Sequence, residues 1–187
     1  MRAAAKNRVR IIGGLWRSRL INFPARAELR PTPDRVRETL FNWLGQDLTG
    51  RVCLDLFAGS GALGFEAASR GSRRVLMVER DPAVYRALAA NRERLAANAV
   101  ELVRADALEF LQVDRGDYDV IFVDPPFAAG LWPRLEPLLP PRLAAGGMVY
   151  HESGDRAEIP PGWVIRKQSR AGQVFFQLLQ RTETSAS

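Results

Sequence analysis

The sequence has little of what metal sites and covalent cross-links are made from. It holds a single cysteine, Cys53, and a single histidine, His151. One cysteine cannot form a disulfide within the chain, which suits a reducing compartment such as the cytoplasm. A zinc site usually draws several Cys and His ligands, and a Ser-His-Asp triad would depend on His151, which lies in or beside a predicted strand. Both kinds of chemistry are therefore disfavoured, and Cys53, inside an apolar run, is expected to be a buried core residue rather than a nucleophile.

The chain also lacks long apolar runs. No segment approaches the ~18 consecutive apolar residues of a membrane-spanning helix. Residues 1–10 are basic and lack the apolar core of a secretory signal. At 187 residues there is room for one domain with a short appendage. We therefore expect a cytoplasmic, monomeric protein with no membrane partner.

Positive charge is present in excess, but only in one region. The net charge is +6, yet residues 1–37 hold ten Lys/Arg and two acidic residues, and the other 150 residues hold 17 and 19. A basic patch of this kind attracts polyanions and speeds their encounter. It predicts a nucleic-acid partner; the alternative is a solvated basic arm that serves only solubility.

The chain divides into two regions and a tail. Residues 1–47 are basic, with predicted strands at 9–12 and 20–23 around a glycine pair, followed by a helix for which Thr32 is the predicted N-cap. Residues 48–181 alternate predicted strands (52–56, 75–78, 100–103, 118–123, 148–151) with predicted helices at 62–69, at 82–98, around 107–112 and somewhere within 132–143. The alternation predicts an α/β fold, a parallel sheet with helices on both faces. Segments 163–168 and 173–179 predict a closing antiparallel hairpin, and 182–187 a disordered tail.

A glycine-rich loop follows the first strand of the second region. Gly59, Gly61 and Gly64 spell G-x-G-x-x-G, and Glu79 lies 20 residues after Gly59. The pattern fits a nicotinamide or flavin cofactor, or another ligand held at a helix start. Asp55, at the carboxyl end of the strand, would repel a pyrophosphate and attract a ligand ammonium group. S-adenosylmethionine carries an ammonium and a sulfonium, so it is the favoured ligand.

Two further acids follow later strands. Glu79 suits a bidentate hydrogen bond to ribose hydroxyls, and Asp106 could accept from an adenine amino group. The alternatives are structural: Asp55 as a turn cap, Glu79 and Arg80 as exposed strand-end charges, and Asp106 as a helix N-cap.

The most specific motif is Asp124-Pro125-Pro126-Phe127, after the strand at 120–123. Two prolines fix φ twice and remove two backbone donors, which leaves a stiff loop rich in acceptors. The Asp124 carboxylate and the Pro125 carbonyl could hold the two protons of a base's exocyclic amine and free its lone pair for attack on a methyl group. Phe127 could stack on the base, which must leave its helix to reach the loop. The alternative is an ordinary turn with a core aromatic.

With these residues in view, the sequence resembles the bacterial RsmD family, the 16S ribosomal RNA guanine-N2 methyltransferases. The resemblance covers roughly residues 8–181 and rests on the segments 10–17, 29–44, 54–64, 122–127 and 171–174. It implies a class I Rossmann-like methyltransferase fold with a mostly parallel seven-stranded sheet. It also implies S-adenosyl-L-methionine as cofactor and 16S rRNA, within the small ribosomal subunit or its assembly intermediate, as partner.

The resemblance also assigns residues to roles. It implies cofactor contacts from Asp55, Phe57, Ala58, Gly59, Ser60, Gly61, Glu79, Arg80, Asp106 and Ala107. It implies target-base contacts and catalysis at Asp124, Pro125, Pro126 and Phe127, with no metal. It suggests rRNA contacts from Arg10, Trp16, Arg17, Arg19, Arg30, Arg35 and Arg37. Rival functions are a DNA adenine-N6 methyltransferase, a nicotinamide-dependent reductase and a catalytically silent RNA-binding module.

Overall fold

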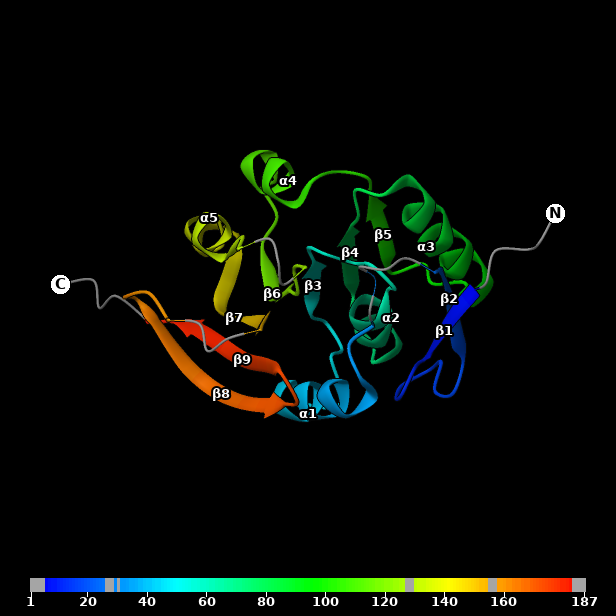
Figure 1. Cartoon of the computed structure of the whole chain (residues 1–187), viewed down its shortest axis with the longest axis horizontal. Coiled ribbons are helices and arrows are strands. Elements are labelled where there is room, and N and C mark those ends of the chain that lie inside the picture. Colours follow the sequence, from blue (N-terminus) through cyan, green and yellow to red (C-terminus); the bar gives the residue numbers. More distant parts are fainter. Residues whose placement is uncertain (1–5, 26–28, 30, 127–129, 155–157, 183–187) are drawn as a thin grey trace.

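A computed structural model describes residues 6–25, 29, 31–126, 130–154 and 158–182. A seven-stranded sheet of order β5-β4-β3-β6-β7-β9-β8 forms its centre, and β1 and β2 form a separate antiparallel pair (Figure 1). The strands are β1 (Lys6–Arg10), β2 (Leu20–Pro24), β3 (Val52–Asp55), β4 (Arg74–Val78), β5 (Val100–Val103), β6 (Tyr118–Val123), β7 (Leu143–Ser153), β8 (Trp163–Ala171) and β9 (Val174–Arg181). The helices are α1 (Asp34–Leu44), α2 (Ala62–Ser69), α3 (Pro82–Leu95), α4 (Ala107–Val113) and α5 (Trp132–Leu135), with short 3₁₀ turns η2 (Glu136–Leu138) and η3 (Pro140–Arg142).

Strands β3 to β7 run parallel, and β9 is antiparallel to both β7 and β8. The strands β3, β4 and β6 carry almost only apolar residues because helices cover both of their faces. The order of strands reverses between β3 and β6, and at such a switch point α/β proteins bind ligands beside the carboxyl ends of the strands. We call this side of the sheet the carboxyl edge. The predicted α/β sheet with its closing antiparallel hairpin is confirmed.

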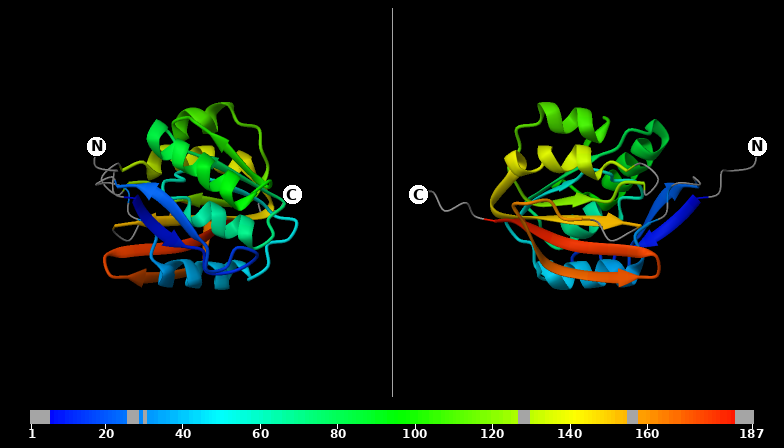
Figure 2. Two further views of the ribbon diagram at one scale, coloured as in Figure 1. Left: turned by 90° about the vertical axis from the view of Figure 1, so that its right-hand side faces the viewer. Right: turned by 60° about the vertical axis from the view of Figure 1, so that its left-hand side comes forward.

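Two hydrophobic cores lie on the two faces of the sheet. One combines residues of α1, α2, α3 and the β1–β2 hairpin; the other combines residues of α4, α5 and the turns that follow α5. Figure 2 shows α4 and α5 above the sheet and α1 below it in its right-hand view. The hairpin contributes Val9, Ile11, Ile21 and Phe23 to the first core, so it packs on the α/β body. Across the part of the chain that the structure describes, no helix is both long and apolar enough to cross a membrane.

The segment 132–143 contains the expected helix, but only as a single turn, α5, followed by two 3₁₀ turns. Prolines at positions 137, 140 and 141 remove the donors that a continuous helix would need. Thr32 is not the N-cap of α1: the cap is Pro33, in an extended conformation with φ −56° and ψ 149°, and the helix begins at Asp34. Thr32 is buried, and its hydroxyl has another partner, described below.

Candidate active site

The glycine loop between β3 and α2 is shaped by backbone conformations that only glycine adopts easily. Gly59 and Gly61 have φ of 50° and 83°, in the left-handed region. A Cβ on Gly61 would come within 2.6 Å of the Phe65 ring. The loop therefore brings bare backbone and the start of α2 to the carboxyl edge, where the free N–H groups of a helix start favour a carboxylate or phosphate group. Of the other loop residues, Ala58 and Ser60 are buried and Phe57 is partly buried.

Asp55 ends β3 and is only 1% exposed. Its Oδ2 accepts from the backbone N–H of Gly64 at 3.0 Å, and its carboxylate also accepts from the backbone of Phe57. The turn-capping alternative for Asp55 is thus observed. Burial, with the negative charge of Asp124 beside it, raises the pKa of Asp55 to about 7. A carboxylate held so unfavourably would be stabilised by a positively charged ligand.

Glu79 and Asp106 follow β4 and β5 along the same edge. Glu79 links two segments: its Oε2 accepts from Gly59 N–H at 3.0 Å and its Oε1 from Asp81 N–H at 2.7 Å. Asp106 caps α4 by accepting from Leu108 N–H at 2.9 Å, so the N-cap alternative is observed too. These structural bonds leave a ligand contact open, because carboxylate oxygens accept more than one bond. Arg80 is exposed and Ala107, the first residue of α4, is buried.

Asp124 follows β6, immediately beside Asp55. The register pairs Asp55 with Phe122, so the chain reaches Asp124 two residues beyond that pair. Asp124 is partly exposed as a residue, and its Oδ2 accepts from the Thr32 hydroxyl at 3.2 Å. Burial of the carboxyl raises the pKa of Asp124 to about 6. Pro125 is buried and Pro126 exposed; Phe127, expected to stack on the base, lies outside the described residues.

A fifth carboxyl at this edge was not predicted from the sequence. Glu152, near the end of β7, is 3% exposed, forms a side-chain hydrogen bond with Asp124 and accepts from the Tyr150 hydroxyl at 2.5 Å. Burial, with the nearby charge of Asp124, raises the pKa of Glu152 to about 8. The signal was available, because acids at strand ends pointed to Asp55, Glu79, Asp106 and Asp124 in the same way.

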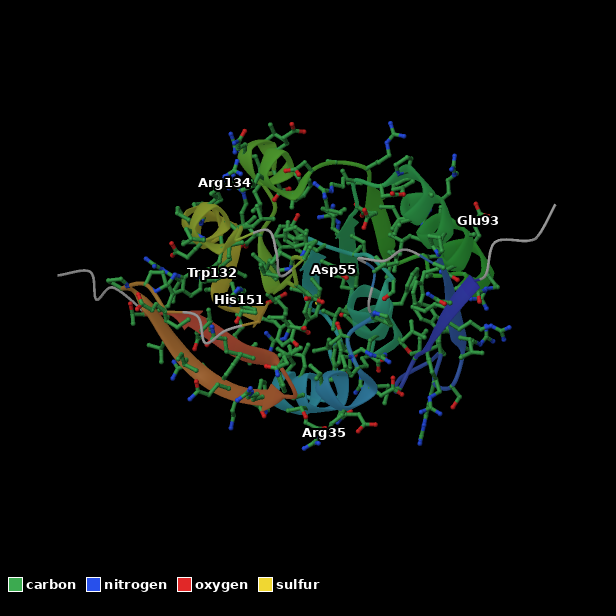
Figure 3. All side chains as sticks on the ribbon, viewed as in Figure 1. Arg35, Asp55, Glu93, Trp132, Arg134 and His151 are labelled. Atoms are coloured by element: carbon green, nitrogen blue, oxygen red, sulfur yellow. The ribbon has the colours of Figure 1, made fainter. Side chains whose placement is uncertain are left out.

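Figure 3 places Asp55 near the middle of the molecule and His151 toward α5. His151 is buried, stacks on Trp132 at 4.0 Å between ring centroids, and has its pKa lowered to about 4 by burial. A buried, neutral histidine that stacks on a tryptophan is a packing residue of β7. Among the described residues, no group of three or more His, Cys, Asp or Glu is arranged to hold a metal ion.

The residues expected to face rRNA separate into exposed and buried ones. Those with exposed positions are Arg10, Arg17, Arg19 and Arg35. Arg30 lies outside the described residues. Trp16 is buried in the first core, 7% exposed, so the expectation that it faces RNA was wrong. The turn around Trp16 packs on Ser69, the last residue of α2, through a Trp16 N–H to Ser69 Oγ bond of 2.9 Å. It therefore lies about 12 Å along α2 from the glycine loop.

Arg37 is also a correction, because its side chain is 1% exposed and fully engaged inside the protein. Its guanidinium forms ion pairs with Asp34 at 2.5 Å and Glu66 at 3.3 Å. It also donates to the carbonyl oxygens of Arg10 at 2.9 Å and Thr32 at 3.1 Å. A guanidinium with these partners supports the fold, and through Thr32 it supports the segment that contacts Asp124.

Known proteins resemble this chain along nearly its whole length. The model of the family described as Conserved hypothetical protein 95 matches residues 9–180. The chain is 41% identical over 183 residues to the ribosomal RNA small subunit methyltransferase D of Escherichia coli, covering 95% of this chain and 92% of that protein. The solved structure of a putative methyltransferase of Escherichia coli superposes with a TM-score of 0.83 at 42% identity, covering 94% of this chain and 98% of that one. A more distant structure, an RNA methyltransferase of Salinibacter ruber in complex with S-adenosyl-L-homocysteine, has the same fold, with a TM-score of 0.65 at 21% identity over 84% and 98% of the two chains.

Proposed function

The chain belongs to the family described as Conserved hypothetical protein 95, the RsmD family, and we propose that it transfers a methyl group from S-adenosylmethionine to the exocyclic N2 amine of one guanine in small-subunit ribosomal RNA. One observation carries the proposal. Asp55 and Asp124 lie side by side at the carboxyl edge, next to a glycine loop and a helix start. Burial is the largest influence on the pKa of both carboxyls, followed by the charge of Asp124 for Asp55 and by a hydrogen bond from Thr32 for Asp124.

The residues of this edge fit S-adenosylmethionine. Asp55 would face its positive charge, the loop backbone around Gly59 and Gly61 would receive its carboxylate, and Glu79 and Asp106 would accept from its ribose and adenine. A pyrophosphate in the same place would meet the charge of Asp55, which disfavours the nicotinamide alternative. When bound, the cofactor supplies an electrophilic methyl group on a sulfonium.

Asp124 and Pro125 would hold the target amine. The amine lone pair is delocalised into the guanine ring, so nitrogen is a poor nucleophile until its protons are held by acceptors. The Asp124 carboxylate and the Pro125 carbonyl supply two acceptors on a loop that the prolines keep stiff. The guanine must be flipped out of its helix to reach them, and Phe127 is the proposed stacking partner.

The substrate proposal rests on the relatives and on charge. The curated relative is named for the RNA of the small subunit. Arg10, Arg17, Arg19 and Arg35 present exposed positive charge from residues 1–47, which we propose as the RNA-facing appendage of a methyltransferase core at 48–181. The protein would act as a monomer, in the cytoplasm, on the small subunit or its assembly intermediate.

The proposal is tested by incubating undermodified small subunits with methyl-labelled cofactor and mapping the label. We expect N2-methylguanosine at one position and no label in naked duplex DNA. Asp124→Ala should bind the cofactor normally and lose at least ~10²-fold in transfer rate, the scale of one lost transition-state contact. Glu93→Ala, at an exposed position on α3, is the control and should behave as wild type. Label in adenine, or normal turnover by Asp124→Ala, would contradict the proposal.

A further inference from the structure

The proposed chemistry leaves Glu152, a buried titratable group at the carboxyl edge, without a role. Glu152 is buried, with only 3% of its surface exposed. Its side chain is hydrogen-bonded to that of Asp124, the residue that would hold the target amine. We propose that Glu152 is a positioning residue that keeps a proton and donates it in a hydrogen bond to Asp124, so that Asp124 stays ionised and correctly oriented for the amine. This inference rests on the proposed function.

The contacts of the two carboxyls define the arrangement. The Tyr150 hydroxyl, from the same strand as Glu152, donates to Glu152 Oε1 at 2.5 Å. On the other side, the Thr32 hydroxyl donates to Asp124 Oδ2 at 3.2 Å. Glu152 and Asp124 themselves share a side-chain hydrogen bond. The Thr32 hydroxyl also acts on Glu152, so two hydroxyls surround a pair of carboxyls that contact each other.

No positive charge balances the pair within the described residues. The groups that act on Glu152 are Asp124, Tyr150 and Thr32, and those that act on Asp124 are Thr32 and Glu152. Behind Asp124 lies Asp55, itself influenced by Glu79, so the next neighbours are acids too. Two carboxyls in contact and away from water cannot both ionise, and a hydrogen bond between them requires one proton.

The position of the proton follows from the surroundings of the two carboxyls. Burial opposes ionisation of both, but the residue Glu152 is buried as a whole whereas Asp124 is partly exposed, which favours the charge on Asp124. The pKa values agree in direction, because that of Glu152 rises to about 8 and that of Asp124 only to about 6. Near neutral pH the pair therefore consists of a neutral Glu152 that donates and an ionised Asp124 that accepts.

This assignment gives Asp124 a defined part in the transfer. The amine nitrogen uses its lone pair to form the new N–C bond as the C–S bond breaks and its electron pair stays with sulfur. One N–H bond then breaks, its electron pair returns to nitrogen, and the proton forms an O–H bond on Asp124. Glu152 already carries a proton, so it cannot take this one, and Asp124 returns it to solvent after product release.

The test is a pH profile of single-turnover transfer at saturating cofactor and undermodified subunit. In wild type we expect the rate to rise as Asp124 ionises near pH 6 and to fall as Glu152 ionises near pH 8. Glu152→Gln keeps an N–H donor but cannot ionise, so it should retain the neutral rate within about threefold and lose the fall at high pH. Glu152→Ala should lose about tenfold or more in rate at unchanged cofactor affinity, because Asp124 then lacks its donor.

Tyr150→Phe is a second, milder variant. The hydroxyl bond favours the ionised form of Glu152, so its removal should move the alkaline fall to higher pH. An unchanged alkaline limb in Glu152→Gln, or a full rate in Glu152→Ala, would overturn the assignment. Thermal melting checks that each variant is folded.

A readout without activity separates this inference from the proposed function. Infrared spectra of the free protein at pH 7, taken as the difference between wild type and Glu152→Gln, should show the band of a buried, protonated carboxyl. The subtraction removes the band that Asp55, with a pKa of about 7, contributes to both proteins. If that band is found but rRNA is not methylated, the protonation of Glu152 is upheld and the proposed function is wrong. If rRNA is methylated and the band is absent, the function stands and the role of Glu152 fails.

Discussion

Two buried groups of charged side chains, close together in the fold, are built on opposite plans. The balanced cluster consists of Arg37, Glu66 and Arg70, whose side chains are at most 4% exposed. The acidic cluster consists of Asp55, Asp124 and Glu152. In the first, each charge meets its opposite; in the second, the acids meet other acids, hydroxyls and backbone N–H groups but no cation among the described residues.

The balanced cluster is complete in itself. Both oxygens of Glu66 are used, by Arg37 at 3.3 Å, by Arg70 at 2.9 Å and by the backbone N–H groups of Ile12 and Gly13 at 2.8 Å each. These bonds fasten the hairpin turn and α1 to α2. Among the described residues the acidic cluster has no cationic partner, and burial raises the pKa of each member. Charge that is neutralised within the chain maintains the fold, whereas unbalanced buried charge is where a ligand completes the structure.

The largest effect that this contrast predicts is on stability. Glu66→Ala would leave two guanidinium groups buried without their carboxylate, together with two unpaired backbone donors. We expect a loss of about 3–5 kcal/mol in the free energy of unfolding, measured in urea. The control is Glu101→Ala, which breaks the exposed 2.7 Å pair with Arg74 and should cost no more than about 1 kcal/mol. Equal losses in the two variants would remove the distinction between a buried network and a surface pair.

A smaller effect concerns the acidic cluster and pH. The pKa of Asp55 is raised from 3.8 to about 7 in the folded protein, so the folded state binds a proton more tightly than the unfolded state. The stability from that proton is fully present below pH ~4 and is lost as pH rises through ~7, by at most about 1.4 kcal/mol per pH unit. Urea unfolding of the cofactor-free protein should therefore show declining stability between pH 5 and pH 8. Asp124 and Glu152, whose pKa values are also raised, add to the decline in the same direction. Asp55→Asn should therefore make the decline less steep without abolishing it, and a slope as steep as in wild type would show that Asp55 does not contribute.

Sequence patterns predicted the layers of this fold well, because the alternation of apolar strands and helices is a local signal. They failed at residues whose burial or hydrogen bonding depends on partners far away in the sequence. Thr32 is of a residue type that often caps helices, but its hydroxyl donates a hydrogen bond to Asp124, 92 residues away. Arg37 belongs by charge to the basic segment, but Glu66, 29 residues away, determines that it is buried. No local pattern distinguishes an arginine that pairs inside from one that faces solvent.

The candidate site was predicted in part for the same reason. Asp55 and Asp124 each follow a strand recognisable from its own residues, and parallel strands bring their carboxyl ends together. Glu152 was missed by one residue: the last parallel strand was expected to end at 151, whereas β7 continues to Ser153. Its role also depends on which strand lies beside β6, which the order of elements along the chain does not state.

The smallest predicted effect separates two arginines on one helix. Arg35 and Arg37 are two residues apart on α1, but Arg35 is exposed, as Figure 3 shows, and Arg37 belongs to the balanced cluster. Arg35→Gln should leave the unfolding free energy within about 0.5 kcal/mol of wild type. It should weaken binding to small-subunit RNA several-fold and lower the slope of log affinity against log salt by about 1, the signature of one lost phosphate contact. Arg37→Gln should do the reverse, with a clear loss of stability and an unchanged salt slope in whatever fraction remains folded. If Arg35→Gln left the slope untouched, the exposed charge near the start of α1 would have no part in RNA binding, and the contrast between the two arginines would rest on folding alone.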